Sequence, residues 1–157
     1  MFVLFGPPGA GKSTLGSALA KKLKLPFYDI DALLEQTHRK PCHILWQMLG
    51  VKKYRKQENI IIRTLKPGIV SCGGGTVLDP DNVTQLKGHG KFVYLSCPID
   101  ILISRYFEKP RAIAKTKEQL KALLEKRFPI YEKIPAIRID SSQSLDNQIK
   151  NILTMYI

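Results

Sequence analysis

The chain has 157 residues, and a length of roughly 100 to 200 residues is typical of one domain, which argues against a multidomain protein. Hydrophobic residues make up 44% of the chain, so a folded core is expected and a disordered polypeptide is excluded. The 25 Lys and Arg exceed the 13 Asp and Glu by 12 charges, which is compatible with nucleic acid, an anionic membrane surface or small phosphorylated substrates as partners.

Short apolar runs alternate along the chain with longer segments of helical period, a pattern typical of an α/β fold with a parallel sheet. Five buried strands are expected at residues 1–5, 26–29, 69–72, 91–96 and 136–139. Helices are expected over 12–23 and near 31–37, 43–48, 52–65, 80–87, 99–106, 116–132 and 143–156. The segment 107–117 is charged and interrupted by Pro110, so a mobile loop is predicted there.

The first predicted strand leads directly into GPPGAGKST, residues 6–14, which matches the phosphate-binding motif GxxxxGK[ST] between a strand and a helix. Its glycines let backbone N–H groups point inward, and the helix N-terminus adds a positive dipole end. Lys12 would contact the β- and γ-phosphates of a nucleotide, and Ser13 would ligate Mg²⁺. The alternative is a glycine-rich turn with an ordinary helix cap, but Lys12 and both flanking elements favour the phosphate loop.

A phosphate loop leaves the phosphoryl acceptor open. Water would imply an ATPase or GTPase, and a small molecule would imply a kinase. No N/TKxD-type guanine motif is visible, and 157 residues leave little room for a motor. The sequence therefore favours a small-molecule kinase.

Two carboxylates, Asp29 and Asp31, stand two residues apart at the end of the predicted second strand. Residues at i and i+2 of a strand share a face, and functional groups of parallel α/β sheets gather at the carboxyl ends of the strands. One carboxylate would hold Mg²⁺ and the other would orient or deprotonate an acceptor hydroxyl. In the alternative, Asp31 only caps the helix near 31–37, with Glu35 in its first turn.

The predicted third strand ends at three consecutive glycines, Gly73, Gly74 and Gly75. Without side chains, their use is a close approach of backbone to another group, with N–H groups offered to an oxygen-rich ligand. A plain flexible loop is the alternative. The basic stretch 52–56, which precedes Glu58, is expected to be mostly a solvated helix face, with one or two members directed at the site.

The order of these motifs resembles the shikimate kinase family over nearly the whole chain: GxxxxGKS, then DID at 29–31, YRKQE at 54–58, SCGGGT at 71–76, Arg111, and KRFPIY at 126–131. The resemblance implies a three-layer, nucleoside monophosphate kinase-like P-loop fold formed by a single domain, 1–157. Within it, helices at about 31–65 would bind substrate and a mobile lid would span about 107–117. The lid departs from the usual Arg-Pro-Leu-Leu, reading RAIA at 111–114, and GV replaces Gly-Glu at 50–51.

The resemblance also implies roles for individual residues, with ATP and shikimate as partners and Mg²⁺ as cofactor. The residues that it assigns to ATP are Gly9, Ala10, Gly11, Lys12, Ser13, Thr14, Arg105 and Arg111. The residues that it assigns to shikimate are Asp31, Arg55, Gly73, Gly74, Gly75 and Arg127. Lys12, Asp31 and Arg111 would be catalytic, and Ser13 and Asp29 would hold the metal.

Other interpretations stay open at this point. A gluconate or nucleoside monophosphate kinase would share the phosphate loop, and a nucleic-acid-binding module would use the basic charge. The apolar runs are far shorter than the roughly 18 to 20 residues that cross a bilayer, and the first residues lack a signal sequence, so a cytoplasmic protein is expected. A monomer is also expected. Cys42, Cys72 and Cys97 show no metal-binding spacing and are predicted to be reduced.

Overall fold

The computed structural model describes residues 1–108 and 113–156. Its five strands are β1 (Phe2–Phe5), β2 (Phe27–Asp29), β3 (Ile69–Ser71), β4 (Lys91–Ser96) and β5 (Ile137–Asp140). The helices are α1 (Lys12–Leu23), α2 (Ile30–His38), α3 (Cys42–Thr64), α4 (Pro80–Lys87), α5 (Ile99–Phe107), α6 (Lys117–Lys133) and α7 (Leu145–Tyr156), with a 3₁₀ turn η1 at Thr76–Leu78. All five predicted strands are confirmed, each to within two residues.

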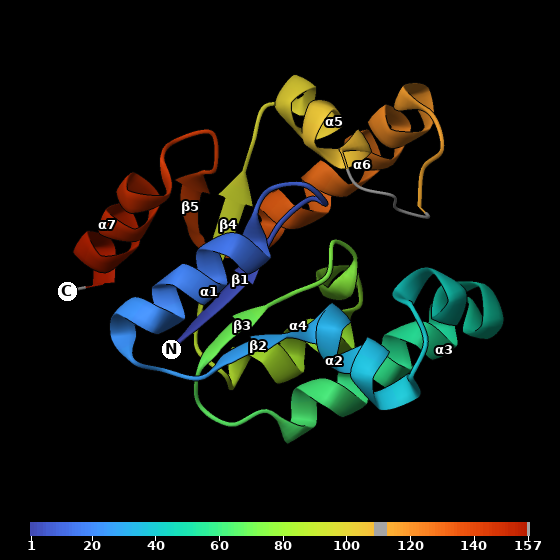
Figure 1. Ribbon diagram of the computed structural model, residues 1–157, viewed down its shortest axis with the longest axis horizontal. Coiled ribbons are helices and arrows are strands. Elements are labelled where there is room, and N and C mark those ends of the chain that lie inside the picture. The colour runs from blue at the N-terminus through green and yellow to red at the C-terminus, as the bar shows by residue number, and fades with distance from the viewer. Residues whose placement is uncertain (109–112, 157) are drawn as a thin grey trace.

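The strands form one parallel sheet in the order β2-β3-β1-β4-β5 (Figure 1). β1 lies at the centre, with Val3 beside Val70 of β3 and Phe92 of β4. β2 and β3 lie on one side of β1 within the sheet, and β4 and β5 lie on the other. The strand order therefore changes direction at β1. Ligands of such sheets bind outside the carboxyl ends of the strands where the direction reverses, so this topology puts the loop after β1 at the expected position.

Helices cover both faces of the sheet, which gives three layers. Successive side chains of a strand point to opposite faces, and β1 therefore contributes to two cores. Phe2 and Leu4 pack in the core with α1, α5 and α7, whereas Val3 and Phe5 pack in the core with α2, α3 and α4. The three-layer α/β architecture predicted from the sequence is confirmed.

α3 joins two segments that the sequence predicts as separate helices, 43–48 and 52–65. At Gly50 the backbone leaves the helical conformation, with φ 71° and ψ 168°. A positive φ is accessible to glycine without steric cost, so the chain bends there and continues as a helix. The second segment carries Tyr54, Arg55 and Glu58, all of which are buried.

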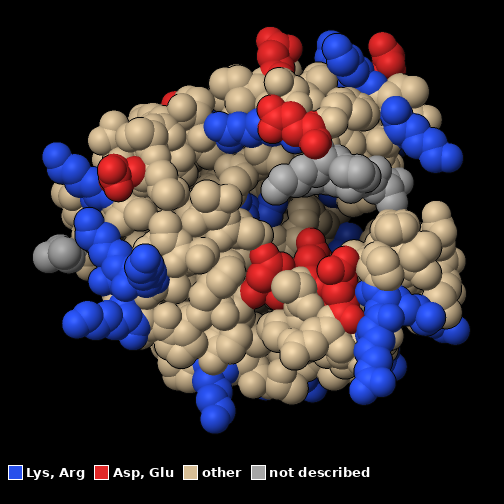
Figure 2. Space-filling model, viewed as in Figure 1, with Lys and Arg blue, Asp and Glu red and all other residues tan. Residues whose placement is uncertain are grey.

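The thiols and the charged side chains are distributed as follows. Cys42, Cys72 and Cys97 are all free thiols. Within residues 1–108 and 113–156, no helix has the length and apolar character needed to cross a membrane. Figure 2 shows Lys and Arg spread around the edge of one face, whose centre is hollowed.

Candidate active site

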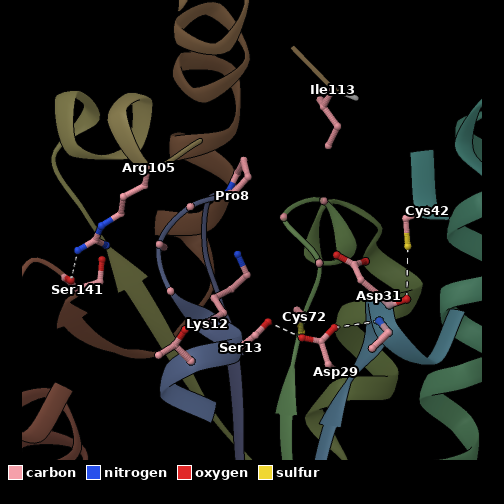
Figure 3. Close-up of a pocket in the computed structure, with 18 of the residues that line it drawn as sticks. Pro8, Lys12, Ser13, Asp29, Asp31, Cys42, Cys72, Arg105, Ile113 and Ser141 are labelled. Carbon is pink, nitrogen blue, oxygen red and sulfur yellow. Dashed lines mark hydrogen bonds between the residues drawn. The ribbon is translucent and has the colours of Figure 1, made fainter. Parts of the chain in front are cut away.

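A cleft of about 800 Å³ opens at the carboxyl ends of the strands. Figure 2 shows the hollow with acidic side chains gathered along one edge, and Figure 3 shows the residues around it. The structure brings most of the predicted site residues together in its wall: Gly9, Ala10, Gly11, Lys12, Ser13, Thr14, Asp29, Asp31, Arg55, Gly73, Gly74, Gly75 and Arg105. Arg127 is buried close to this wall. Arg111 lies outside the described residues.

The phosphate loop follows β1 and ends where α1 begins. Gly9 and Gly11 have φ values of 85° and 86°, in the left-handed region that favours glycine. Gly11 caps α1 without a side-chain acceptor, and the first turn of the helix holds no acidic residue. The positive end of the helix dipole therefore faces the cleft with no protein carboxylate in that turn to neutralise it, as an anion site requires.

Lys12 bridges its own loop. Its Nζ donates to the carbonyl oxygens of Gly6 at 3.0 Å and Pro7 at 2.8 Å, and the side chain is buried. In Figure 3 the side chain rises between the phosphate loop and the loop after β3. The ammonium group is thus held above the cradle where the outer phosphates of a nucleotide would lie.

Ser13 and Asp29, the two predicted metal ligands, are in direct contact. The hydroxyl of Ser13 donates to Oδ2 of Asp29 (Figure 3). It also lies 3.4 Å from the hydroxyl of Ser71. The other oxygen of Asp29 accepts from the backbone N–H of Ala32 at 3.1 Å and caps α2. Hard oxygen donors of this kind suit Mg²⁺, which usually keeps several waters and takes one or two protein carboxylates beside substrate phosphates.

Asp31 occupies a different position from the one expected. β2 ends at Asp29, so Asp31 lies in the first turn of α2, and the shared strand face assumed from the i, i+2 spacing does not apply to it. The residue that caps the helix is Asp29, which removes the interpretation of Asp31 as a simple cap. Asp31 is nevertheless partly buried in the wall of the cleft.

The surroundings of Asp31 favour its protonated form. Burial, followed by the nearby carboxylates of Asp29 and Glu58, raises the pKa of Asp31 to about 6, although Lys12 and Arg55 oppose the shift. Its backbone carbonyl accepts from Cys42 Sγ at 3.4 Å, which ties α2 to the start of α3. Such a carboxyl changes its protonation state just below neutral pH, a property suited to a general base.

Arg55 is held in the wall of the cleft by a buried ion pair. Its Nη1 lies 2.7 Å from Oε2 of Glu58, one helical turn further along α3. Burial raises the pKa of Glu58, while Arg55 and the hydroxyl of Thr76 stabilise the carboxylate. The guanidinium carbon also lies 5.1 Å from the ring centre of Trp46, so Glu58 and Trp46 together fix one cation at the edge of the cleft.

The glycine triplet makes room for these side chains. A Cβ at Gly73 would lie 2.6 Å from Oδ1 of Asp31, and one at Gly75 would overlap the guanidinium of Arg55. A Cβ at Gly74 would come within 3.0 Å of Pro8 in the phosphate loop. The predicted close approach of the backbone is therefore found, but toward protein side chains from three different segments.

The end of α6 supports the triplet from behind. The hydroxyl of Tyr131, whose pKa burial raises to about 12, donates to the carbonyl of Gly74. Arg127, one turn earlier, is 6% exposed, and a Cβ at Gly74 would lie 3.5 Å from its Nη1. Among the described residues, no hydrogen-bond partner reaches that nitrogen. A buried N–H group without an acceptor is costly, and a bound anion would supply the missing partner of this nitrogen.

Arg105 lies at the other end of the cleft, on α5. Its Nη2 donates to the carbonyl of Ser141 after β5 at 3.2 Å (Figure 3). The carbonyl of Ser141 also accepts from Gln148 at 3.4 Å. The cleft thus extends from the phosphate loop in two directions, toward Arg105 on one side and toward Asp31 and Arg55 on the other.

Sequence reasoning gave no role to Glu58 and Tyr131, although both belong to quoted motifs. The i, i+3 spacing of Arg55 and Glu58 on one helix was a usable signal, because such residues are neighbours on the helix surface. Trp46 lines the cleft and also packs against the core on that face of the sheet. No local pattern indicates that Tyr131 reaches the loop of Gly74, 57 residues earlier.

A phosphate loop beside a separate group of acidic and basic side chains in one cleft is typical of a P-loop kinase that acts on a small acceptor. The family model described as "Shikimate kinase" matches residues 8–156. A shikimate kinase of Legionella pneumophila (strain Paris) is 32% identical over 161 residues, covering 98% of this chain and 92% of the relative. The chain belongs to the shikimate kinase family.

Solved structures agree with this assignment. A shikimate kinase from Acinetobacter baumannii in complex with shikimate superimposes with a TM-score of 0.89 at 28% identity, covering 99% of this chain and 91% of that one. A gluconokinase from Sinorhizobium meliloti reaches 0.67 at 21% identity, covering 98% and 89%, and shares the fold alone. The comparisons therefore support a shikimate kinase over the gluconate and nucleotide alternatives.

Proposed function

We propose that this protein transfers the γ-phosphoryl group of ATP to the 3-hydroxyl of shikimate, giving shikimate 3-phosphate. The observation that carries the proposal is the glycine triplet, against which Asp31 and Arg55 pack in the same cleft as the phosphate loop. The Acinetobacter relative was solved with shikimate bound. Phosphoryl transfer depends mostly on alignment and charge stabilisation, and these residues supply both.

In this proposal the nucleotide lies along the phosphate loop and reaches toward Arg105. Backbone groups of residues 9–14 hold the phosphates, and Lys12 exchanges its loop carbonyls for phosphate oxygens. Arg105 flanks the adenine, because the end of the cleft formed by α5 and the loop after β5 is the part distant from Asp31 and Arg55. ATP fits this division of the cleft, with its base at one end and its γ-phosphate facing the acceptor.

Mg²⁺ is proposed to bind at Ser13 and Asp29. Their contacting oxygens are hard donors that lie beside the phosphate loop. When bound, the metal would neutralise charge on the transferring phosphoryl group. Asp29 would hold Mg²⁺ directly or through water, as its role in capping α2 leaves Oδ2 directed toward Ser13.

The acceptor is proposed to lie between Asp31 and the two arginines. Asp31 would accept a hydrogen bond from the 3-hydroxyl of shikimate and take up its proton during transfer. Arg55 and Arg127 would bind the substrate carboxylate, since a planar guanidinium makes paired charge-assisted bonds. The partnerless Nη1 of Arg127 supports this assignment. The N–H groups of Gly73, Gly74 and Gly75 would approach the ring.

Residues 1–157 would act as one cytoplasmic, monomeric domain, with substrate-binding helices at about 31–65 and a lid at about 107–117 that brings Arg111 to the transferring phosphoryl group. No nucleic-acid partner is proposed, because Tyr54, the aromatic residue within the basic stretch 52–56, is buried and unable to stack on a base.

The substrate assignment is tested by coupled ADP release with shikimate, gluconate and AMP as acceptors. We expect stimulation above the background ATPase rate with shikimate alone. Stimulation by gluconate or AMP without shikimate would overturn the substrate while leaving the phosphate loop intact. Release of ADP that no acceptor stimulates would indicate hydrolysis.

The pKa of Asp31 predicts the pH dependence of the reaction. Because burial raises this pKa to about 6, the base is ionised above that pH and protonated below it. We expect kcat/KM for shikimate at saturating Mg·ATP to fall about tenfold per pH unit on the acid side. Glu35→Gln, which removes another carboxyl of the cleft, should leave this limb in place. A profile that stays flat to pH 5 would contradict the role of Asp31.

The contact between Gly75 and Arg55 predicts a specific steric effect. Gly75→Ala is expected to raise the KM for shikimate about tenfold, because overpacking of this kind typically costs 1–3 kcal/mol. The backbone at Gly75, with φ −109° and ψ −1°, tolerates alanine, so the added methyl group alone disturbs Arg55. Gly88→Ala is the matched control, since its Cβ would meet only Gln85 O at 3.4 Å. Equal kinetics for the two variants would refute the packing argument.

A further inference from the structure

We propose that Asn82, on α4 and outside the wall of the cleft, positions Arg55 for the substrate by holding its partner Glu58. This inference rests on the proposed function, in which Arg55 binds the carboxylate of shikimate. Asn82 would act as a positioning residue, since its contacts are with Glu58 and the backbone of η1 and not with the cleft.

The carboxylate of Glu58 is the centre of a buried network. Its Oε2 accepts from Nη1 of Arg55 at 2.7 Å and from Nδ2 of Asn82 at 3.1 Å. Its Oε1 accepts from the hydroxyl of Thr76 at 2.8 Å. Glu58, Thr76 and Asn82 are fully buried. The oxygen that binds Arg55 is therefore also the oxygen that Asn82 fixes.

The neighbours of Asn82 determine the orientation of its amide. Nδ2 also donates to the backbone carbonyl of Thr76 at 3.1 Å, and a carbonyl can only accept. Oδ1 accepts from Nδ2 of Asn59 at 3.1 Å, and Asn59 Oδ1 accepts from Arg63 Nε at 2.9 Å. If the amide of Asn82 were flipped, its oxygen would face two acceptors, Oε2 of Glu58 and the carbonyl of Thr76. The network therefore allows only the orientation in which Nδ2 donates to Glu58.

Loss of this donor would act on Arg55 through two effects. Burial already raises the pKa of Glu58, and Arg55 and Thr76 oppose that shift. Nδ2 of Asn82 is a further donor to this carboxylate, and loss of a donor to a charged acid makes the acid easier to protonate. A neutral Glu58 would lose its attraction for the guanidinium. The carboxyl group would also lose an anchor on the side away from Arg55 and could rotate. As a result of both effects, the guanidinium of Arg55 would no longer be held in its position beside Gly75.

The near-isosteric variant Asn82→Asp tests the proposal, because it replaces Nδ2 by an oxygen that faces the acceptors of Glu58 and Thr76. We expect the KM for shikimate to rise about tenfold, as loss of a hydrogen bond to a charged group predicts, and the KM for ATP to change less than about twofold. Asn82→Ala removes the same donor without adding a carboxylate. Because KM does not depend on the active fraction of a preparation, reduced folding yield does not obscure the result. Asn147→Asp, at an exposed position on α7, is the matched control.

Two further measurements separate positioning from general damage. In an Arg55→Ala background, Asn82→Ala should cause no further increase in the KM for shikimate. With shikimate methyl ester, which lacks the carboxylate charge, wild type and Asn82→Ala should have the same kcat/KM within about twofold, because the lost interaction would be absent from both.

The outcomes distinguish the proposed role of Arg55 from the proposed role of Asn82. If Arg55→Ala itself leaves the KM for shikimate unchanged, the proposed role of Arg55 fails, and this inference fails with it. If Arg55→Ala raises that KM but neither variant at Asn82 does, the inference alone is overturned. It is also overturned if the Asn82 variants raise the KM for ATP as much as that for shikimate.

Discussion

Replacing Asp31 by asparagine is expected to lower kcat about a thousandfold, within the range usual for loss of a general base. The amide keeps the shape and can still meet the 3-hydroxyl, but it cannot take its proton. The KM for ATP should change little, because the phosphate loop holds the nucleotide. Initial rates over a grid of both substrates measure the two effects, and the acid limb of the pH profile should vanish from the residual activity.

The same variant is expected to be more stable than the wild type above pH 6. Because the pKa of Asp31 is raised from 3.8 to about 6 in the folded protein, its protonated form stabilises the fold. That stabilisation is complete below pH 3.8 and is lost as the pH rises through about 6. The amide of Asp31→Asn carries no charge at either pH and avoids this loss of stability. The Tm of the variant should therefore exceed that of the wild type at pH 8 and should not exceed it below pH 3.8. The exposed variant Asp146→Asn is the control for the kinetic prediction and should keep the kcat of the wild type. If Asp31→Asn also keeps that kcat, Asp31 is not the general base.

Arg55→Ala and Arg127→Ala are each expected to raise the KM for shikimate about 100-fold, since each removes a paired, charge-assisted interaction with a carboxylate. The KM for ATP should change less than about threefold, because neither side chain reaches the phosphate loop in this proposal. Steady-state kinetics with each substrate varied in turn provide the measurement.

Arg138→Ala is the control for these variants, since Arg138 is an exposed arginine whose partner, Glu132, is also exposed. It should leave both KM values unchanged. An equal rise in the KM for shikimate and for ATP in either site variant would indicate a general distortion of the cleft, and the assignment of that arginine to the carboxylate would then be withdrawn. Lysine at either position should restore part of the affinity, as it keeps the charge but not the planar fork.

The secondary structure was largely predictable because its signals are local. Strands buried on both faces appear as continuous apolar runs, and the phosphate loop is a contiguous motif whose parts act together. The boundary between β2 and α2 was less accessible. Asp29 ends the strand and also caps the helix, which moves Asp31 into the helix, and spacing alone does not distinguish these two positions.

The site was predictable as a set of residues but not as an arrangement. The triplet of glycines indicated a close backbone approach, yet the groups that approach it are Asp31, Arg55 and Pro8. Glu58 was visible in the motif around Arg55, but its bond to Asn82 spans 24 residues. Whether two such polar residues meet depends on how α3 and α4 pack, and no local pattern encodes that packing.

The sequence by itself determined the class of chemistry, because a phosphate loop, a pair of carboxylates and a glycine triplet each carry their function in a few adjacent residues. It also determined the alternation of strands and helices. The tertiary structure alone decided the strand order, the raised pKa of Asp31 and the buried network that holds Arg55. These features arise when groups distant in the chain are removed from water together, since desolvation and charge act through space and not along the sequence.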